Sequence, residues 1–418
     1  MWYNALTMTA QVLAYPFLFL ALFVESFVLV TFFSAPARRT RARAPLATLP
    51  RVAIIVPCWN EESTIGATAD SLLALEYPKD LLEIILVNNN STDGTAAVMQ
   101  RYAANPQVQV LFEANAGKHN AVNAGIRATS AEYVGCLDAD SFVEPSALKE
   151  SVAAFDAPEV GAVTAGMSVH KPSNLLQHMQ NAEYIFGITR QNALATVGGI
   201  HVTPGPFSLY RRSAVLSVGG FQHGHQVEDL EMALRLQRAG FRINNAPKAR
   251  VYTKAPSTVL KLVKQRTRWT SGYLRNVMHE YRDMIGNSRY GALGLITLPI
   301  GTLTIASGIL VFALALYEFA KHAATALSVR AGIPLSYSLL PHGHWSWFYL
   351  PGSLYTLLAA VTIGAAVIMI ALGKRASQTP GSLALGVIGY VTLYGLVAPL
   401  WLIRSTWDVA LGKKRGWR

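Results

Sequence analysis

Charged residues and cysteines are scarce in this sequence, and each shortage excludes a class of protein. Asp, Glu, Lys and Arg make up 14% of the 418 residues, whereas 51% are hydrophobic. Disordered chains show the opposite balance, with high charge density and low hydrophobicity. Two cysteines, Cys58 and Cys136, are too few for a small scaffold held together by disulfides. The sequence also lacks internal repeats and low-complexity segments, so we expect a folded protein that is not built from repeats.

Long hydrophobic runs are abundant instead. The runs 291–317, 350–373 and 383–403 contain no charged residue, and a fourth run, 10–33, contains only Glu25. Each run is long enough to cross roughly 30 Å of hydrocarbon at about 1.5 Å per residue. We therefore predict four membrane-spanning helices, with a buried core helix as the alternative for each. Glu25 is either a functional intramembrane carboxylate or a packing residue nearer the interface.

The charges that flank these runs lead to a conflict in topology. The run 10–33 is too long for the hydrophobic part of a cleaved signal, and it is followed by a stop-transfer pattern, Arg38, Arg39, Arg41 and Arg43. Residue 38 onward would then be cytosolic. Three further crossings would place the C-terminus outside, yet its tail is basic, and basic segments prefer the cytosol. Either this preference is overridden or a re-entrant segment lies within 333–350.

Short β-rich segments alternate with helical patterns between the first two hydrophobic runs. The predicted strands are 52–57, 81–87, 108–112 and 133–137, and the predicted helices are 63–75 and 93–103. This alternation favours a parallel, three-layer α/β sheet, whose ligands bind beyond the carboxyl ends of the strands. Polar residues gather at these ends: Trp59 to Glu62 after the first strand, Asn88 to Asp93 after the second, and Asp138 to Asp140 after the fourth.

The net charge of +12 lies mainly outside this α/β module. Residues 51–290 hold 23 basic and 21 acidic residues, whereas the rest of the chain holds 13 basic and 3 acidic. Basic residues beside membrane spans suit the anionic headgroups of lipids. Inside the module, 258–281 is a basic amphipathic segment typical of an interfacial helix. Because basic and aromatic residues do not interleave elsewhere, we expect no nucleic-acid partner.

Two acidic motifs could carry chemistry. Asp138 and Asp140 can share a hard divalent cation whose shell is completed by diphosphate oxygens, although a solvated turn has the same pattern. Glu228 and Asp229 precede a helical run, 230–239. They are either first-turn carboxylates favoured by the helix dipole or, if they point into the cleft, the source of a general base.

A third motif, Gln265-Arg266-Thr267-Arg268-Trp269, lies in the interfacial segment. An arginine there could pair with a diphosphate, and the tryptophan could offer an aromatic face to a sugar ring. Snorkelling basic residues and an interfacial tryptophan are the alternative, and the two interpretations are compatible.

Together the motifs resemble those of the membrane-embedded family 2 glycosyltransferases, which have a GT-A fold and include hyaluronan, chitin, cellulose and poly-N-acetylglucosamine synthases. The resemblance covers roughly residues 50–285. Its motifs, in order, are Val56 to Glu61, Asn90 to Thr95, Asn115 to Asn123, Asp138 to Asp140, Pro204 to Arg212, Glu228-Asp229 and Gln265 to Trp269.

The resemblance implies how the chain is divided. It implies a Rossmann-like, three-layer GT-A domain at 50–255 and an amphipathic interfacial segment at 256–290. It also implies a transmembrane helix within 1–36, about three spans within 291–404 and a basic tail at 405–418.

The resemblance also implies a role for individual residues. Asp229 would be the general base, with Glu228 beside it, and Asp140 and Asp138 would bind Mg²⁺ or Mn²⁺. The implied nucleotide-sugar residues are Pro57, Trp59, Glu61, Asn89, Lys118, Asp138 and Arg268. The implied acceptor residues are Gln265, Trp269, Gly205 and Pro206.

The stretch Asn88-Asn89-Asn90 departs from the family pattern. Many relatives carry an aspartate there that contacts the uracil or ribose. An asparagine can still hydrogen-bond a base edge but lacks the charge, so the base of the donor stays open. Asp93 is retained, and we expect it to cap the helix that follows.

The implied activity is metal-dependent, inverting hexosyl transfer from a nucleotide-diphosphate sugar, UDP-linked by resemblance, to a growing polysaccharide. The protein would be a multi-pass protein of a plasma (bacterial inner) membrane with a cytosolic catalytic domain, and the polymer could leave through the spans. A transferase that adds one sugar to a lipid or short acceptor is the alternative. A membrane sugar-nucleotide sensor without catalysis is a third interpretation, supported only by Asn88-Asn89-Asn90.

Overall fold

The computed structural model describes residues 2–34, 49–329 and 354–413. The predicted re-entrant segment at 333–350 and the arginines at 38–43 lie outside the described residues. The strands are β1 (Val52–Cys58), β2 (Leu82–Asn88), β3 (Val108–Phe112), β4 (Tyr133–Cys136), β5 (Ser141–Val143), β6 (Val160–Val169), β7 (Ser208–Arg211) and β8 (Arg242–Thr253). The α-helices are α1 (Trp2–Ser34), α3 (Ile65–Leu73), α4 (Thr95–Gln100), α5 (Lys118–Ala128), α6 (Ala147–Val152), α7 (Leu175–Thr196), α8 (Arg212–Ser217), α9 (Glu228–Arg238), α10 (Val259–Arg275), α11 (Leu298–Val329), α13 (Leu354–Ser377) and α14 (Ala384–Ala410).

The strands form one eight-stranded sheet in the order β3-β2-β1-β4-β7-β6-β8-β5. The first four of these are parallel, as the alternating sequence pattern predicts. The second half is mixed, because β7 runs antiparallel to both β4 and β6, and β5 runs antiparallel to β8. The sequence pattern identified only the four parallel strands, and the second half of the sheet adds antiparallel pairs to them. β7 lies between β4 and β6 and has only four residues. So short a strand contains no hydrophobic run that the sequence alone would show.

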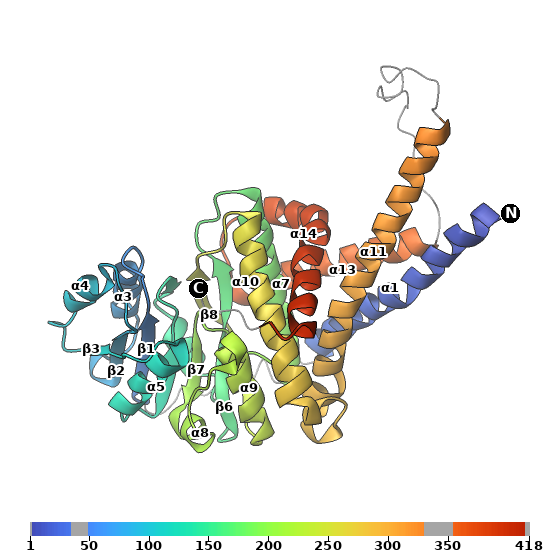
Figure 1. Ribbon diagram of the computed structural model, residues 1–418. Coiled ribbons are helices and arrows are strands. Elements are labelled where there is room, and N and C mark those ends of the chain that lie inside the picture. Colours follow the sequence, from blue (N-terminus) through green and yellow to red (C-terminus); the bar gives the residue numbers. More distant parts are fainter. Residues whose placement is uncertain (1, 35–48, 330–353, 414–418) are drawn as a thin grey trace.

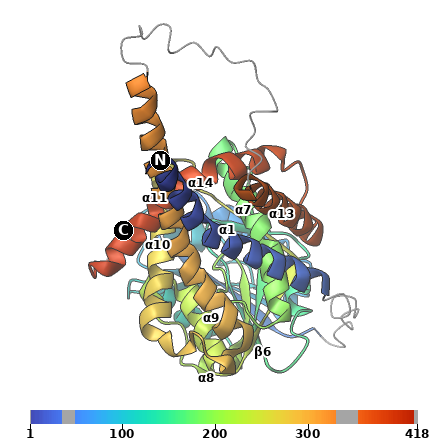
Figure 2. The ribbon, with the colours of Figure 1, turned by 90° about the vertical axis from the view of Figure 1, so that its right-hand side faces the viewer.

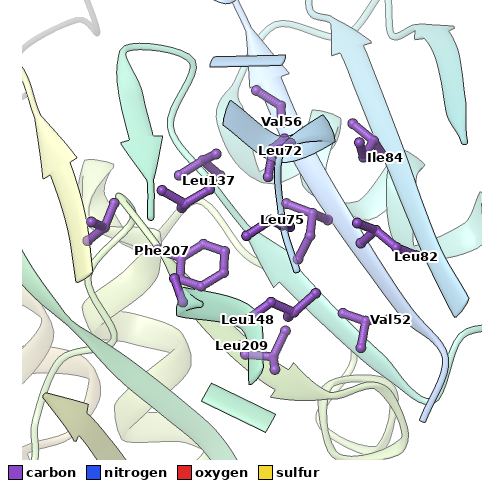
Figure 3. Packing of buried hydrophobic residues seen from close by; sticks show 14 of the residues in the cluster. Val52, Val56, Leu72, Leu75, Leu82, Ile84, Leu137, Leu148, Phe207 and Leu209 are labelled. Carbon is purple, nitrogen blue, oxygen red and sulfur yellow. The ribbon is translucent and has the colours of Figure 1, made fainter. Parts of the chain in front are cut away.

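Two hydrophobic layers cover the two faces of the sheet. Alternate residues of β1 point to opposite faces, so Val52, Ile54 and Val56 join one layer, and Ala53 and Ile55 join the other. The first layer is completed by α3 and α6, as the packing in Figure 3 shows. The second is completed by α5, α8 and α9. The predicted three-layer α/β architecture is confirmed.

Four helices in the described ranges are long and apolar enough to cross a membrane, which agrees with the four hydrophobic runs. They are Leu13–Ser34 within α1, Leu293–Ser328 including α11, Leu354–Ser377 (α13) and Ala384–Ala410 (α14). α1 and α11 extend away from the sheet, whereas α14 lies beside α7 and α10 (Figures 1 and 2).

The α/β domain meets these apolar helices through α7. The hydroxyl of Thr189 on α7 donates a hydrogen bond to the carbonyl oxygen of Met369 on α13 at 2.6 Å. A Cβ atom at Gly373 would overlap the carbonyl oxygen of Ile185, so only a glycine permits this approach of α13. Small residues at helix contacts allow backbones to pack closely in membrane proteins. The domain is therefore joined to α13 by backbone-level contact.

Candidate active site

The loops after β1 and β2 are hydrogen-bonded to each other at the carboxyl edge of the sheet. Asn60 has a left-handed backbone conformation, with φ 57°, which asparagine adopts more readily than most residues. Its side-chain oxygen accepts a hydrogen bond from the N–H of Thr92 at 2.8 Å. The N–H of Glu61 donates to the hydroxyl of Thr95 at 2.7 Å. The first two strand-end motifs therefore form one hydrogen-bonded unit.

Asp93 strengthens this unit from the start of α4. Its carboxylate accepts the N–H of Thr95 at 3.0 Å and the N–H of Glu62 at 3.2 Å. It lies just before the N-cap residue, Gly94. Gly94, not Asp93, therefore occupies the N-cap position that was expected for Asp93, but Asp93 still accepts the first N–H of the helix and ties the helix to the loop after β1.

Asn89 holds the loop that leads into α5. Its amide group donates to the carbonyl oxygens of Glu113 at 3.1 Å and Asn115 at 2.7 Å, and its oxygen accepts the N–H of Gly117 at 2.8 Å. These bonds use both donors of a buried side chain. The contact of Asn89 with a nucleotide stays a prediction. In the structure its role is to fix Gly117, and through it Lys118.

Lys118 begins α5 and connects the two acidic motifs. Its ammonium group lies 2.5 Å from Asp138 Oδ1 and 3.2 Å from Glu228 Oε1. Burial alone would lower the pKa of this lysine, but the two carboxylates outweigh burial and raise the pKa well above its usual value. Lys118 is therefore a permanent cation between the predicted metal motif and the predicted base motif.

Asp229 lies in the first turn of α9 and is held by backbone groups. Its Oδ1 accepts the N–H of Leu230 at 2.8 Å, and its Oδ2 accepts the N–H of Gly205 at 3.2 Å. Its carbonyl oxygen accepts the hydroxyl of Thr203 at 2.7 Å. The N-cap of α9 is Val227, so neither acid of the pair caps the helix. The predicted base therefore contacts the predicted acceptor segment directly.

Gly205 completes a cluster of five predicted site residues. A Cβ atom at this position would lie 2.6 Å from Lys118 Nζ and 3.0 Å from Asp138 Oδ2. A side chain at this position would therefore force the Lys118–Asp138 ion pair to shift. The structure therefore brings together Gly205, Lys118, Asp138, Glu228 and Asp229.

Burial and charge push the pKa values of the acidic pair apart. Burial, followed by the charge of Glu228, raises the pKa of Asp229 to about 6. Burial would raise the pKa of Glu228 as well, but Lys118 and Arg268 outweigh it and lower that pKa. Neighbouring groups whose pKa values are driven apart are typical of acid–base sites. Asp229 is the member suited to accept a proton near neutral pH.

The loop before α9 has a strained backbone. Gly224, His225 and Gln226 have φ values of 52°, 53° and 70°. Two of these residues are not glycine, so the left-handed conformation is unfavourable for them. Arg268 Nη1 donates to the carbonyl oxygen of Gln226 at 3.1 Å, and the amide of Asn276 donates to that of Gly224 at 2.8 Å. Side chains of α10 and of the turn after it therefore hold the loop that leads into Glu228 and Asp229.

The predicted metal ligands, Asp138 and Asp140, lie directly after β4. Burial, followed by the carboxylates of Asp138 and Glu61, raises the pKa of Asp140 to about 6, which indicates a surplus of negative charge. Among the described residues, no three His, Cys, Asp or Glu side chains gather closely enough to hold a metal ion by themselves. Mg²⁺ is commonly held by one or two carboxylates and substrate phosphates. The two aspartates therefore fit a cation that is shared with a diphosphate.

The remaining nucleotide-side residues lie at the end of β1. Pro57 and Trp59 are half-buried there. Glu61 Oε2 accepts the hydroxyl of Thr64 at 2.6 Å, and burial, with a smaller effect of Asp138, raises the pKa of Glu61. This end of β1 is therefore electrostatically coupled to the metal motif. The contacts of these three residues with a base and ribose stay predictions.

The motif of α10 reaches the acidic cluster through two of its residues. Arg268 lowers the pKa of Glu228 and binds the strained loop, as described above. Trp269 packs on a hydrophobic cluster that contains Val227 and Leu230, which flank the acidic pair. Gln265 Oε1 is buried and accepts no hydrogen bond. Pro206, beside Gly205, is half-buried.

Several residues of the site carry no strong sequence signal. Thr203 is one, and Asn123 is another, since its side chain bonds both the N–H and the carbonyl oxygen of Phe221 at 2.8 Å. The rings of His119 and His223 meet edge to face with centroids 5.6 Å apart. Asn123 could have been singled out from the sequence, because it is the last residue of the motif Asn115 to Asn123. The two histidines could not have been paired from the sequence.

Comparison with known proteins agrees with this geometry. The sequence model of the family described as "Glycosyltransferase like family 2" matches residues 50–272, which is more than half of the chain. The poly-beta-1,6-N-acetyl-D-glucosamine synthase of Staphylococcus epidermidis is 33% identical over 258 residues, which are 60% of this chain and 62% of that protein. The synthase of the same name from Staphylococcus aureus strain COL is 34% identical over 247 residues, 58% of this chain and 59% of that one. The match thus spans about three fifths of each relative.

A solved structure shows the same fold over nearly the whole chain. It is the mannosyltransferase PcManGT from Pyrobaculum calidifontis in complex with GDP-Man and Mn²⁺, with a TM-score of 0.61 and 19% identity. The similarity covers 97% of this chain and 99% of the other. The α/β domain therefore has the GT-A fold. With the family match and the ordered motifs, this chain belongs to the family 2 glycosyltransferases.

Proposed function

We propose that this protein is an inverting glycosyltransferase that moves a sugar from a nucleotide diphosphate to a growing polysaccharide at the cytosolic face of a membrane. The observation that carries the proposal is the cluster of Asp229, Glu228, Lys118, Asp138 and Gly205, in which a carboxyl with a pKa of about 6 lies against the acceptor segment. The names of the similar synthases favour N-acetylglucosamine as the sugar that is transferred, and UDP is the first nucleotide to test.

In the proposed reaction Asp229 removes the proton of the acceptor hydroxyl. That oxygen attacks the anomeric carbon from the side opposite the diphosphate, and the bond to the leaving diphosphate breaks with inversion. Gly205 and Leu230 orient the Asp229 carboxylate through their N–H groups. Lys118 and Arg268 offset the negative charge that collects at the diphosphate. In this proposal Trp269 contacts the acceptor.

The metal motif contributes in the same place. Asp140 and Asp138 would hold Mg²⁺ or Mn²⁺ against the diphosphate, where the cation supplies Lewis-acid stabilisation of the leaving group. The protein with the similar fold binds Mn²⁺. We expect EDTA to abolish the release of nucleoside diphosphate, and added Mg²⁺ or Mn²⁺ to restore it. Unchanged turnover in EDTA would contradict metal dependence.

The central experiment is a donor screen with the full-length protein in lipid nanodiscs. Release of nucleoside diphosphate is measured for UDP-, GDP- and TDP-sugars, followed by radiolabelled transfer with the best donor. We expect Asp229→Asn to lower transfer by about 10²–10⁴-fold, because a general base is lost, and Asp140→Asn to lower it strongly as well. Asp80→Asn, an exposed aspartate outside the site, is the matched control. Transfer close to wild type in Asp229→Asn would contradict the assignment of Asp229 as the general base.

Transfer of a single sugar to a lipid or short acceptor is the second candidate function. One observation favours it: the described residues contain only four membrane-length helices, which is a small number for a translocation channel. Gel sizing of the radiolabelled product separates the two functions. Long smears support polymer synthesis, whereas one discrete, lipid-extractable species supports single addition.

A further inference from the structure

A buried ion pair links α7 to the motif of α10. Arg266 Nη2 lies 2.7 Å from Glu183 Oε2, and both side chains are largely shielded from solvent. The other oxygen of the same carboxylate, Oε1, accepts the hydroxyl of Tyr394 on α14 at 3.3 Å. A buried charge persists only when a partner satisfies it. The position of the Arg266 guanidinium is therefore set by two other helices, α7 and α14.

The same guanidinium covers the ring of Trp269. Its central carbon lies 4.4 Å from the centroid of that ring and 5.6 Å from that of Tyr184. Residues three apart on a helix lie on one face, so Arg266 and Trp269 meet naturally. A planar guanidinium stacks on an aromatic face in a way that a lysine ammonium does not reproduce. Trp269 is thus held between Arg266 and the hydrophobic cluster that contains Val227 and Leu230.

We propose that Glu183 and Arg266, braced by Tyr394, are positioning residues that set the orientation of Trp269, so that α14 controls the acceptor end of the site. The contacts form a continuous chain from Tyr394 through Glu183 and Arg266 to Trp269. From Trp269 the chain continues to the residues that flank the acidic pair. The proposal rests on the proposed function in one respect, namely that Trp269 faces the acceptor. Arg266 and Thr267 are the two motif positions that had no assigned role.

The orientation of Trp269 is measured without any substrate. The full-length protein, with its eight tryptophans replaced by fluorotryptophan, is studied by fluorine NMR in nanodiscs, and the Trp269 resonance is identified by its loss in Trp269→Phe. We expect Glu183→Gln, Arg266→Lys and Tyr394→Phe each to shift or broaden this resonance. Tyr390→Phe removes a hydroxyl one turn away on α14, where the ring lies tilted against that of Tyr394 with centroids 4.9 Å apart, and it should leave the resonance in place. A wild-type Trp269 resonance in Glu183→Gln and Arg266→Lys would overturn the proposal.

Kinetics then test the consequence for the acceptor. With UDP-N-acetylglucosamine and an N-acetylglucosamine oligosaccharide as probes, Glu183→Gln should raise the acceptor KM at least about fivefold and leave the donor KM within about twofold. Equal rises in both KM values would indicate a general structural defect and overturn the positioning role. If wild type transfers no sugar to the oligosaccharide, the proposed function has failed for this acceptor, and the NMR result still decides the positioning.

A double variant guards against failure to fold. Removing one partner of a buried ion pair leaves an uncompensated charge, whereas replacing both with apolar residues of similar size is often tolerated. We therefore include Arg266→Met with Glu183→Met. A folded double variant with a displaced Trp269 resonance supports positioning, and one with a wild-type resonance and a wild-type acceptor KM contradicts it.

Discussion

At the scale of single residues, a pH dependence follows from the proposal that Asp229 is the general base. Burial and Glu228 raise its pKa to about 6, and a general base works only when it is ionised. Activity should therefore be complete above this pKa and fall as the pH drops through about 6, roughly tenfold per pH unit below it. The profile of kcat/KM against pH measures this directly. An acid limb centred near 4 would show that the base is an unperturbed carboxyl.

Lys118 offers an independent check on the same limb. Its positive charge lowers the pKa of Asp229, opposing the effect of burial. Lys118→Met removes that charge, so the pKa of Asp229 should rise and the acid limb should move to higher pH. The overall rate should also fall, because Lys118 bridges the two acidic motifs. If the rate falls but the acid limb of the pH profile stays in place, Lys118 does not influence the pKa of the base.

Activity should be sensitive to a side chain at position 205, because an added Cβ atom would crowd the Lys118–Asp138 ion pair. In Gly205→Ala the new Cβ would meet Lys118 Nζ at 2.6 Å and Asp138 at 3.0 Å, so the ion pair must shift. We expect a loss of activity of at least about tenfold, as for a misplaced catalytic group, with little change in melting temperature. Gly187→Ala is the control, because nothing lies within 4 Å of its added Cβ. Equal activities in the two variants would contradict the tight contact.

Residue types at the strand ends could be predicted, whereas their partners could not. The motifs around Asp138, Asp229 and Lys118 are short and local, so a single sequence contains them. The bridge of Lys118 from Asp138 to Glu228 depends on how three distant segments meet at the edge of the sheet. Asn89 illustrates the limit, since its polarity is visible in the sequence but its three bonds into the next loop are not.

At the scale of elements, the prediction succeeded mainly in the parallel half of the sheet. The first four strands and the helices α3 and α4 lie close to their predicted ranges. The interfacial segment forms α10 up to Arg275 and then turns through a short π-helical stretch, Asn276–Glu280. The last four strands, β5 to β8, were not predicted. β5 and β7 have only three or four residues and carry too little pattern to outweigh their neighbours. β6 and β8 are longer, but glycine or polar residues interrupt the hydrophobic pattern of each.

The junction of α13 and α7 should be sensitive to a single branched side chain. Gly373→Val would place carbon atoms against the Ile185 carbonyl, and a backbone group cannot move aside as a side chain can. Overpacking of this kind costs roughly 1–3 kcal/mol, so the melting temperature in detergent should fall by several degrees. Gly364→Val on the same helix, whose added Cβ meets nothing within 4 Å, should melt close to wild type. Identical melting of both variants would contradict this packing.

At the scale of the whole molecule, the position of α14 addresses the conflict in topology. Near its start, a Cβ at Gly386 would lie 2.6 Å from the carbonyl oxygen of His178 on α7. Near its end, Arg275 of α10 donates to the carbonyl oxygen of Asp408 at 3.3 Å. One end of α14 therefore contacts the α/β domain through α7 and the other contacts the interfacial helix α10, although α14 is apolar and long enough to cross. If α14 lies along the membrane surface, α1, α11 and α13 are the three crossings, and the basic tail stays on the catalytic side.

Cysteine labelling in intact cells tests this topology. Both native cysteines are buried, so Lys413→Cys reports on the C-terminal side and Ser63→Cys on the catalytic domain, since both positions are exposed. A membrane-impermeant maleimide should label neither variant in intact cells and both after permeabilisation. Labelling of Lys413→Cys alone in intact cells would place the two regions on opposite sides and make α14 a true crossing.

The left-handed stretch at residues 224–226 has a consequence for laboratory evolution. Each non-glycine residue in this conformation costs about 1 kcal/mol or more, so Gln226→Gly is among the simplest routes to a more heat-resistant protein. Position 226 lies three residues before Asp229. A less constrained backbone there would also hold the proposed base less firmly. Stability gained at such sites commonly lowers activity. Populations selected only for surviving heat should therefore accumulate glycine at position 226, and those selected also for turnover should retain the strain.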